Sequence, residues 1–201
     1  KQLGESEVVF ETQKILVHAV DTCGWRDYLN HISALTHSDA VVMVVSASMG
    51  EGEVALCRTS AALNDARIAL MLGISNIIVA INKLDTVEWS RARFDELTTE
   101  FYKVLQRMGW KGPIQFIPCS AVRNINITCR ADPNTDRDVP SWVSSFPLLF
   151  DALDGIPLPE EGNLKPLRLP IDSVMPFHDG TIIVKGKVEY GSARVGQRVQ
   201  F

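Results

Sequence analysis

Three short groups of polar residues follow apolar, β-branched runs in this chain, and one of them suits the recognition of a purine base. Asn82, Lys83, Leu84 and Asp85 come directly after the apolar run at residues 76–81. A carboxylate such as Asp85 can accept two hydrogen bonds from N1 and N2 of guanine, which adenine cannot offer. The Lys83 stem can cover one face of the base while its ammonium stays solvated, and Asn82 can tie the loop to its neighbours. Taken alone, the same residues also fit a solvated turn after a strand.

A second group, Ser120 and Ala121, follows the apolar run at residues 114–119. The backbone N–H groups there can reach guanine O6, and the Ser120 hydroxyl can brace the loop. Alone, this pair of small residues indicates little. Its meaning comes from its position, one strand and one helix after Asp85, because open α/β sheets bind ligands at the carboxyl ends of their strands.

The third group is Asp21 followed by Gly24, at the end of the apolar run at residues 15–20. A carboxylate at Asp21 can hold the water shell of a Mg²⁺ ion. Gly24 can bring its backbone N–H close to a γ-phosphate because no side chain intervenes. A simple Asp–Gly turn is the alternative, but three such groups in one order, each at a strand end, indicate a nucleotide site. The phosphate-cradling pattern G-x-x-x-x-G-K-[ST] does not occur in the 201 residues.

Composition excludes several other classes of function. The net charge is −4 and the pI about 5.6, so we expect no general basic surface for sequence-specific binding of nucleic acid. The four cysteines lack the C-x-x-C spacing of zinc sites, and we expect them to be the reduced thiols of a cytoplasmic protein. All apolar runs are shorter than the about 20 residues that cross a membrane.

Apolar runs alternate with helical periodicity along residues 1–155, which predicts a mainly parallel α/β sheet covered by helices. Two short runs joined by a turn at residues 11–14 predict a β-hairpin. Helices are expected at residues 54–72 and 90–108, each followed by a glycine, and residues 124–140 are expected to form an exposed loop. The predicted strands cover residues 8–10, 15–20, 40–47, 76–81 and 114–119, and a short last helix covers residues 146–153.

The composition changes after Gly155. Residues 156–164 contain two prolines and a glycine and are predicted to be a linker. Short β-rich runs then predict the start of an all-β domain at residues 165–201, which is too short to close a barrel. These predicted strands cover residues 167–170, 181–184 and 187–190.

The polar groups and their surroundings resemble the translational GTPases of the elongation factor one-alpha group over nearly the whole chain. The stretch at residues 185–191 looks more like the class II release factor, or the ribosome-rescue GTPase that partners Pelota, than like the aminoacyl-tRNA carrier. The resemblance implies a Ras-like P-loop NTPase G domain at residues 1–155, without its P-loop and switch I, followed by part of a β-barrel domain at residues 165–201. Besides the three groups it rests on Phe10-Glu11-Thr12, Arg26-Asp27, Ser38-Asp39-Ala40, Gly50-Glu51, Leu72-Gly73-Ile74, Trp89, Arg93-Phe94 and residues 116–120 and 165–170.

The resemblance also implies roles for individual residues and partners. Asn82, Lys83 and Asp85 would read guanine, and Ser120 and Ala121 would close over the base. The expected cofactors are GTP or GDP together with Mg²⁺. The expected partners are the ribosome and a release-factor-like or Pelota-like protein, with no membrane and no sequence-specific nucleic acid.

At the γ-phosphate the resemblance assigns Asp21 and Gly24 to Mg²⁺ and phosphate, but the chain departs from the family there. The family pattern is D-[AC]-P-G-H, in which the histidine orients the attacking water; here Cys23 replaces the proline and Trp25 replaces the histidine. An indole has only an N–H donor and cannot take the proton of that water. We therefore expect weak GTP hydrolysis. The alternative is that Trp25 is a hydrophobic plug in a drifted loop.

A second departure lies at residues 61–65, where the family has Q-T-R-E-H and this chain has A-A-L-N-D. Good helix formers remain, so we expect the fold to survive while contacts with the ribosome or partners change. The expected function is that of a GTP-binding translation factor of the termination or ribosome-rescue type, which delivers a tRNA-shaped partner protein to the ribosome. Two alternatives stay open: a non-hydrolysing GTP-bound adaptor in RNA surveillance, and an elongation-factor-type carrier of aminoacyl-tRNA.

Overall fold

The computed structural model describes residues 6–21, 32, 34–57, 60–132, 134–157 and 166–200. The chain divides into two compact units, Lys1–Ile156 and Pro157–Phe201. The first unit has an α/β architecture, and the second contains a pair of antiparallel strands.

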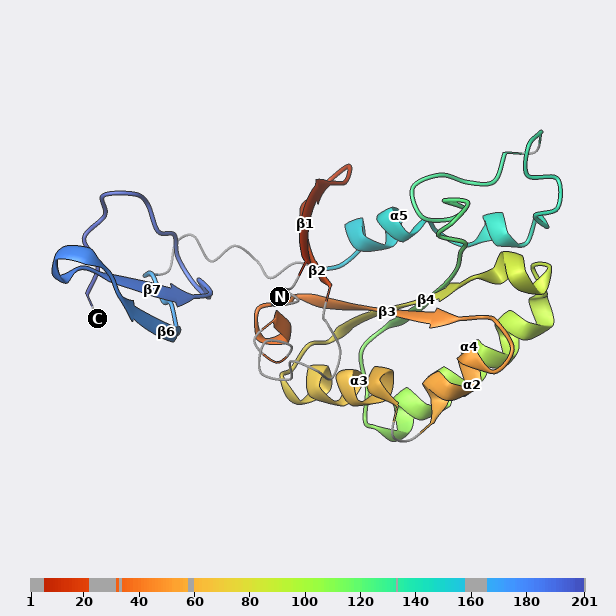
Figure 1. The fold of residues 1–201 in the computed structure, drawn as a ribbon, viewed down its shortest axis with the longest axis horizontal. Coiled ribbons are helices and arrows are strands. Elements are labelled where there is room, and N and C mark those ends of the chain that lie inside the picture. The colour runs from red at the N-terminus through yellow and green to blue at the C-terminus, as the bar shows by residue number, and fades with distance from the viewer. Residues whose placement is uncertain are drawn as a thin grey trace. The chain divides into compact units, whose positions relative to one another are not determined.

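A three-stranded parallel sheet forms the centre of the first unit, as the alternation of strands and helices predicts (Figure 1). Its order is β3 (Ala40–Ser46), β4 (Asn76–Asn82) and β5 (Ile114–Pro118). In register, Ser46 pairs with Asn82, and Ile81 pairs with Pro118. All three strands therefore end at the same edge of the sheet, so the loops that follow them are neighbours.

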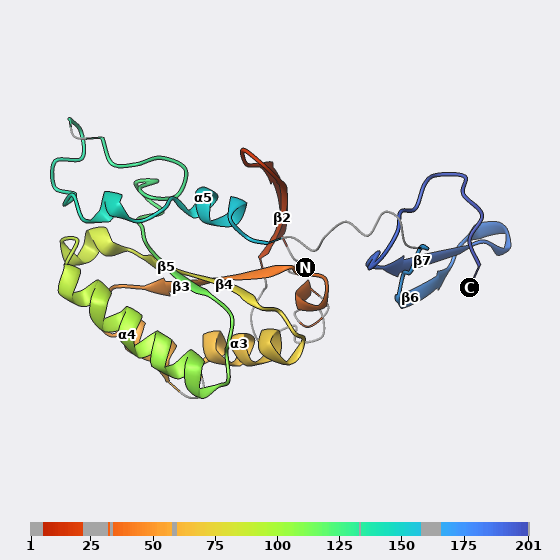
Figure 2. The same cartoon turned by 180° about the vertical axis from the view of Figure 1, so that it is seen from behind.

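The central strand β4 is buried on both faces, which explains its nearly continuous apolar sequence. Ile77 and Val79 belong to the larger core cluster, together with residues of the helices on one face. Ile78, which points the other way, packs in a second cluster with residues of α5 (Leu149–Asp154). Figures 1 and 2 show three helices on one face of the sheet, α2 (Glu51–Leu56), α3 (Ala61–Met71) and α4 (Arg91–Arg107), and α5 on the other.

Helix α4 (Arg91–Arg107) follows the prediction from its periodicity. The Ser90 hydroxyl accepts a hydrogen bond from the Arg93 backbone N–H at 3.3 Å and so caps the first turn. Gly109 adopts a φ of 95°, which stops the helix, since side-chain-bearing residues rarely adopt this conformation. The apolar face is buried against the sheet and comprises Phe94, Leu97, Phe101 and Leu105.

The prediction of a single helix at residues 54–72 is wrong, because two separate helices occupy this part of the chain. They are α2 (Glu51–Leu56) and α3 (Ala61–Met71). Cys57 is extended, and the Ser60 hydroxyl accepts from the Leu63 N–H at 3.2 Å while donating to the Ala55 carbonyl at 2.7 Å. A serine that caps a new helix competes with helix continuation, and this local competition breaks the periodic pattern.

The predicted hairpin is present as β1 (Ser6–Glu11) and β2 (Leu16–Asp21), an antiparallel pair separate from the central sheet. The Phe10 and Phe150 rings stack with centroids 4.9 Å apart. The Thr12 hydroxyl, in the turn, donates a hydrogen bond to the Asp154 carboxylate. These contacts attach the hairpin to α5.

The loop at residues 124–140 is mostly exposed, as expected, but it has a buried anchor. Ile125 is 1% exposed and Asn126 is fully buried. The Asn126 side-chain amide donates to the Val143 carbonyl at 2.8 Å. The last helix is shorter than the predicted 146–153, because α5 begins after Pro147. The anchor holds the loop close to the edge where β5 ends.

The second unit confirms one predicted strand and corrects two. Its pair consists of β6 (Ile171–Pro176) and β7 (Ile182–Gly186), joined around Asp179 and Gly180, both with positive φ. The runs expected at 167–170 and 187–190 contribute only a bridge between Arg168 and Tyr190. Strand β6 contains an aspartate, a serine and a proline, so its sequence did not predict a strand, and pairing with β7 decides it. No barrel is present among residues 166–200.

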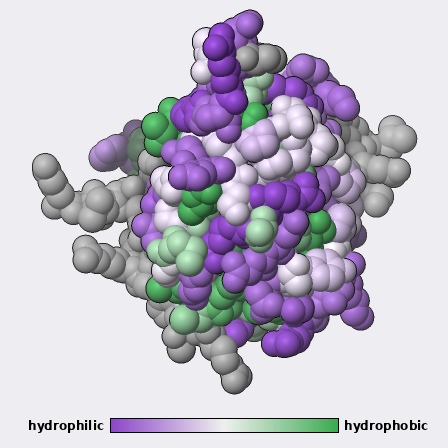
Figure 3. Space-filling model, turned by 90° about the vertical axis from the view of Figure 1, so that its right-hand side faces the viewer, coloured by the Kyte–Doolittle hydropathy of each residue, from purple (hydrophilic) through white to green (hydrophobic). Residues whose placement is uncertain are grey.

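Hydrophilic and hydrophobic residues are interspersed on the visible face in Figure 3, which views the molecule from the right-hand side of Figure 1. Within the described ranges, no helix combines the length and the apolar character needed to cross a membrane.

Candidate functional site

Two of the three polar groups meet at the edge where β4 and β5 end. The Leu84 N–H points to the Cys119 carbonyl at 3.4 Å, and the Ala47 N–H donates to the Asn82 carbonyl at 2.8 Å. Backbone hydrogen bonds therefore connect the chain segments at the ends of β3, β4 and β5. This arrangement follows from the parallel register, which brings the ends of three strands to one edge.

Asn82 joins the loop after β4 to the loop after β5. Its side-chain carbonyl accepts from the Lys83 N–H at 2.8 Å and from the Ala121 N–H at 2.9 Å. One acceptor oxygen thus fixes the start of both loops. Removal of this oxygen would leave two backbone donors without their partner.

Lys83 adopts a left-handed backbone conformation with φ 63° and ψ 28°. Its ammonium lies 2.7 Å from the Glu51 carboxylate at the start of α2. The Thr86 hydroxyl donates to the Lys83 carbonyl at 2.7 Å. Both ends of the Lys83 residue are therefore held, and sequence reasoning did not identify Glu51 as a contact.

Asp85 lies in the first turn of the short 3₁₀ helix η2 (Leu84–Val87). Its Oδ1 atom is buried and has no hydrogen-bond partner among the residues that the structure describes. A buried carboxylate oxygen without a donor is costly, and each such atom calls for an explanation. Trp110 Nε1 and Asn126 Oδ1 are further buried side-chain atoms without a partner among the described residues. As a carboxylate oxygen, Asp85 Oδ1 can accept a hydrogen bond from an N–H group that gains access to it.

The loop after β5 differs in one respect from the expectation that its amides reach a base. The Cys119, Ser120 and Ala121 N–H groups already donate to Ile81, Ile125 and Asn82 oxygens. Recognition of guanine O6 by Ala121 would require its N–H to leave Asn82. The Ser120 hydroxyl accepts from the Arg123 N–H at 3.4 Å, so it does contact its own loop.

Cys119 is a structural thiol at the base of this site. Burial, followed by the nearby Asp85 charge, raises the pKa of its thiol to about 12. The residue is 2% exposed and its sulfur lies 3.6 Å from the Ile81 carbonyl. The thiol stays protonated at neutral pH and acts as a small apolar side chain.

Arg123 stabilises the loop after β5 and was missed by sequence reasoning. Its guanidinium contacts the Asp138 carboxylate at 2.5 and 2.8 Å and the Asp136 carboxylate at 2.7 Å. The Trp89 indole N–H donates to Asp138 at 3.3 Å, and the Arg123 guanidinium carbon lies 5.9 Å from the Trp89 ring. Asp136 and Asp138 are 13 and 15 residues away in a polar loop, so no local pattern reveals the pairing.

This pairing predicts an acid-resistant loop. The hydrogen bonds from Arg123 lower the pKa of Asp138 from 3.8 to about 2, so the pair stabilises the fold above pH 3.8. The stabilisation is lost as the pH falls through about 2, where Asp138 takes up a proton in the folded protein. NMR titration of the Asp138 carboxyl carbon is expected to show this low midpoint.

The Arg123→Ala variant is the matched comparison for that titration, because it removes the donor and keeps the carboxylate. Its Asp138 midpoint is expected to rise towards the ordinary 3.8. Equal midpoints in the two proteins would contradict the assignment.

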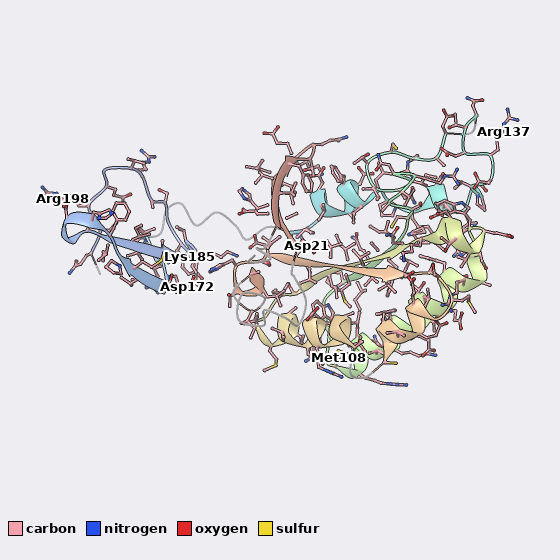
Figure 4. All side chains as sticks on the ribbon, viewed as in Figure 1. Asp21, Met108, Arg137, Asp172, Lys185 and Arg198 are labelled. Carbon is pink, nitrogen blue, oxygen red and sulfur yellow. The ribbon has the colours of Figure 1, made fainter. Side chains whose placement is uncertain are left out.

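The third polar group does not join this cluster. Asp21 is exposed at the end of β2, and Figure 4 places it away from the arrowhead of β3 that marks the common edge. Gly24 and Trp25 lie outside the described residues. Among the described residues no group of three or more His, Cys, Asp or Glu side chains could hold a metal ion. The Mg²⁺ role of Asp21 therefore stays a prediction.

Curated relatives are similar in sequence to this chain over part of their own length. Elongation factor 1-alpha of Pyrobaculum calidifontis is 33% identical over 196 residues, which cover 96% of this chain and 43% of the relative. Elongation factor 1-alpha of Caldivirga maquilingensis is 35% identical over 194 residues, with coverage of 96% and 42%. The chain thus spans less than half the length of these relatives.

Solved structures of Sup35 share its fold. The structure of Sup35 complexed with GDP matches with a TM-score of 0.59 and 27% identity, over 92% of this chain and 42% of that chain. The structure complexed with GMPPNP matches with a TM-score of 0.52 and 30% identity, over 77% and 37%. Residues 4–161 also match the family described as the elongation factor Tu GTP binding domain. The match covers most of the chain, which therefore belongs to the elongation factor Tu GTP-binding-domain family.

Proposed function

We propose that this chain is the guanine-nucleotide-binding part of a translational GTPase of the elongation factor 1-alpha and Sup35 kind. The observation that carries the proposal is the Asp85 carboxylate in the loop after β4, whose buried Oδ1 atom has no hydrogen-bond partner in the part of the chain that the structure describes. Guanine presents two adjacent N–H donors at N1 and N2, and a carboxylate can accept both. A bound guanine would therefore supply the donor that this oxygen lacks.

The surrounding residues support the same ligand. Asn82 joins the loops after β4 and β5, and the held Lys83 side chain can form a wall for the base. Ser120 and Ala121 lie in the adjoining loop and would close over it. Family membership supports a guanine nucleotide as the cofactor. In this proposal Asp21 holds Mg²⁺ through water, and the Gly24 N–H contacts the γ-phosphate.

The finer proposal is a factor of the termination or ribosome-rescue type, acting in the cytoplasm on the ribosome. It would deliver a tRNA-shaped, release-factor-like or Pelota-like protein. The structural likeness to Sup35 supports this branch, as does the sequence at residues 185–191. The elongation factor 1-alpha relatives support the alternative of aminoacyl-tRNA delivery.

A second candidate is a non-hydrolysing GTP-bound adaptor in RNA surveillance. Trp25 favours it, because the family has a water-orienting histidine there and an indole cannot accept a proton. The altered residues 61–65, at the start of α3, favour changed partner contacts as well. The rate of GTP hydrolysis distinguishes this candidate from the first.

Calorimetric titration of the intact native protein with GDP and ADP tests guanine binding. GDP is expected to bind at least about a hundredfold more tightly, because adenine leaves the Asp85 carboxylate without donors at a cost of about 3 kcal/mol. Equal affinity for the two nucleotides, or no binding of GDP, would contradict the proposal.

A further inference from the structure

Two side-chain contacts connect the start of α2 and the loop before it to the loop after β4. The Glu51 carboxylate lies 2.7 Å from the Lys83 ammonium, and the Ser48 hydroxyl lies 2.9 Å from the Thr86 hydroxyl. Thr86 in turn donates to the Lys83 carbonyl at 2.7 Å. We call the Glu51–Lys83 and Ser48–Thr86 pairs the α2 bridge. The bridge contacts Lys83 from the side chain and from the backbone.

Glu51 is held in place by the packing of α2. At Gly52, the next residue, an added Cβ would lie 2.8 Å from the Ser46 carbonyl and 2.9 Å from the Leu97 side chain. This contact leaves room only for glycine and brings the start of α2 against the end of β3 and against α4. The position of the Glu51 backbone is thus set by its neighbours.

A buried arginine of α4 contacts the segment that contains Glu51, on both sides of that residue. Arg93 is 7% exposed, and its Nε donates to the Ala47 carbonyl at 3.0 Å. Its Nη2 lies 2.7 Å from the Glu53 carboxylate, whose other oxygen accepts from the Gly50 N–H at 2.7 Å. The carboxylate of Glu51 therefore extends from a fixed support.

The Glu51 carboxylate is charged and directed at Lys83. Its hydrogen bonds from Lys83 and then from Ser46 lower its pKa below the ordinary value. The Lys83 and Glu51 side chains are about half exposed, at 47% and 55%. A lysine has four rotatable bonds, so without this partner its stem would sample many directions at the site.

We propose that Glu51 is a positioning residue for base recognition: it holds the Lys83 side chain in one direction, so that the lysine stem forms an ordered wall for the base. The inference rests on the proposed guanine site. Because Glu51 already restricts the Lys83 side chain before the nucleotide binds, little conformational entropy of that side chain is lost on binding. Loss of Glu51 should therefore weaken binding. The effect acts through the face of the base and not through its hydrogen-bonding edge.

The test compares Glu51→Ala with Glu100→Ala in the intact native protein. Glu100 pairs with Lys103 at 2.8 Å in α4, with both side chains about half exposed, so it controls for the loss of a surface ion pair. Dissociation constants are measured for GDP and for inosine diphosphate, which lacks the N2 amino group but has the same base face.

Glu51→Ala is expected to weaken the affinity for both nucleotides by one common factor of about three to five, which is the size of effect typical of an exposed ion pair. Glu100→Ala should leave both affinities unchanged. Glu51→Gln, which keeps an acceptor without the charge, should fall between Glu51→Ala and the wild type. High salt should reduce the difference between wild type and Glu51→Ala, because it screens the pair.

Three results would overturn the inference. Wild-type affinity in Glu51→Ala would show that the pair does not position Lys83 for binding. A change in the ratio of the dissociation constants for GDP and inosine diphosphate would show that Glu51 acts at the edge of the base. A wild-type protein that binds neither nucleotide would overturn the proposed function itself, and this inference with it.

Discussion

Asp85→Asn is expected to lower the affinity for GDP by at least about a hundredfold and to create binding of xanthosine diphosphate. The substitution replaces one carboxylate oxygen by an NH₂ donor, which faces the N–H groups of guanine unfavourably. Xanthine carries a carbonyl in place of the N2 amino group, so it offers an acceptor to the new donor. Calorimetric titration of the intact protein with both diphosphates measures the exchange of specificity.

Asp95→Asn is a suitable control for the loss of one negative charge. Asp95 is an exposed residue of α4 that pairs with Arg91 at 2.9 Å. This variant should keep the nucleotide preference of the wild type. If Asp85→Asn also kept it, the unpartnered Oδ1 atom would have no part in reading guanine.

Trp25→His is expected to raise GTP hydrolysis by about a hundredfold, with little change in nucleotide affinity. The family has a histidine at this position, and an imidazole, unlike an indole, can accept a hydrogen bond or a proton from water and so orient it. The expectation depends on residue identity alone, because Trp25 lies outside the described residues. Multiple-turnover assays with the intact protein, with and without ribosomes, measure the rate.

Trp25→Phe separates the effect of the imidazole from that of a smaller ring. Phenylalanine is apolar and accepts no proton, so this variant should hydrolyse GTP as slowly as the wild type. Fast GTP hydrolysis by the wild type itself would contradict the adaptor hypothesis and favour a conventional translational GTPase. A wild-type protein that binds GTP without turning it over would favour the adaptor.

Several elements of the fold could be predicted because their patterns are local and strong. Strand β4 reads as an unbroken apolar run, and its burial on both faces agrees. Helix α4 combines a serine cap, a periodic apolar face and a terminal glycine. In both cases a single stretch of chain contains the whole signal, so no knowledge of distant contacts is needed.

Other elements could not be predicted because competing interactions decide them. At Ser60 the apolar pattern favours one continuous helix, but the Ser60 side chain caps a new helix instead, so the helix is divided there. Strand β6 has weak strand propensity and forms through pairing with β7. The extent of each element there depends on a balance between local preference and partners elsewhere in the chain.

By itself the sequence determined which chemical groups stand at the ends of β4 and β5, because residue type and position after an apolar run are local properties. The tertiary structure decided what those groups contact. It joined Lys83 to Glu51 across 32 residues and left one oxygen of Asp85 buried with no donor among the described residues. Such contacts depend on register and packing between separate elements, which no stretch of sequence encodes alone.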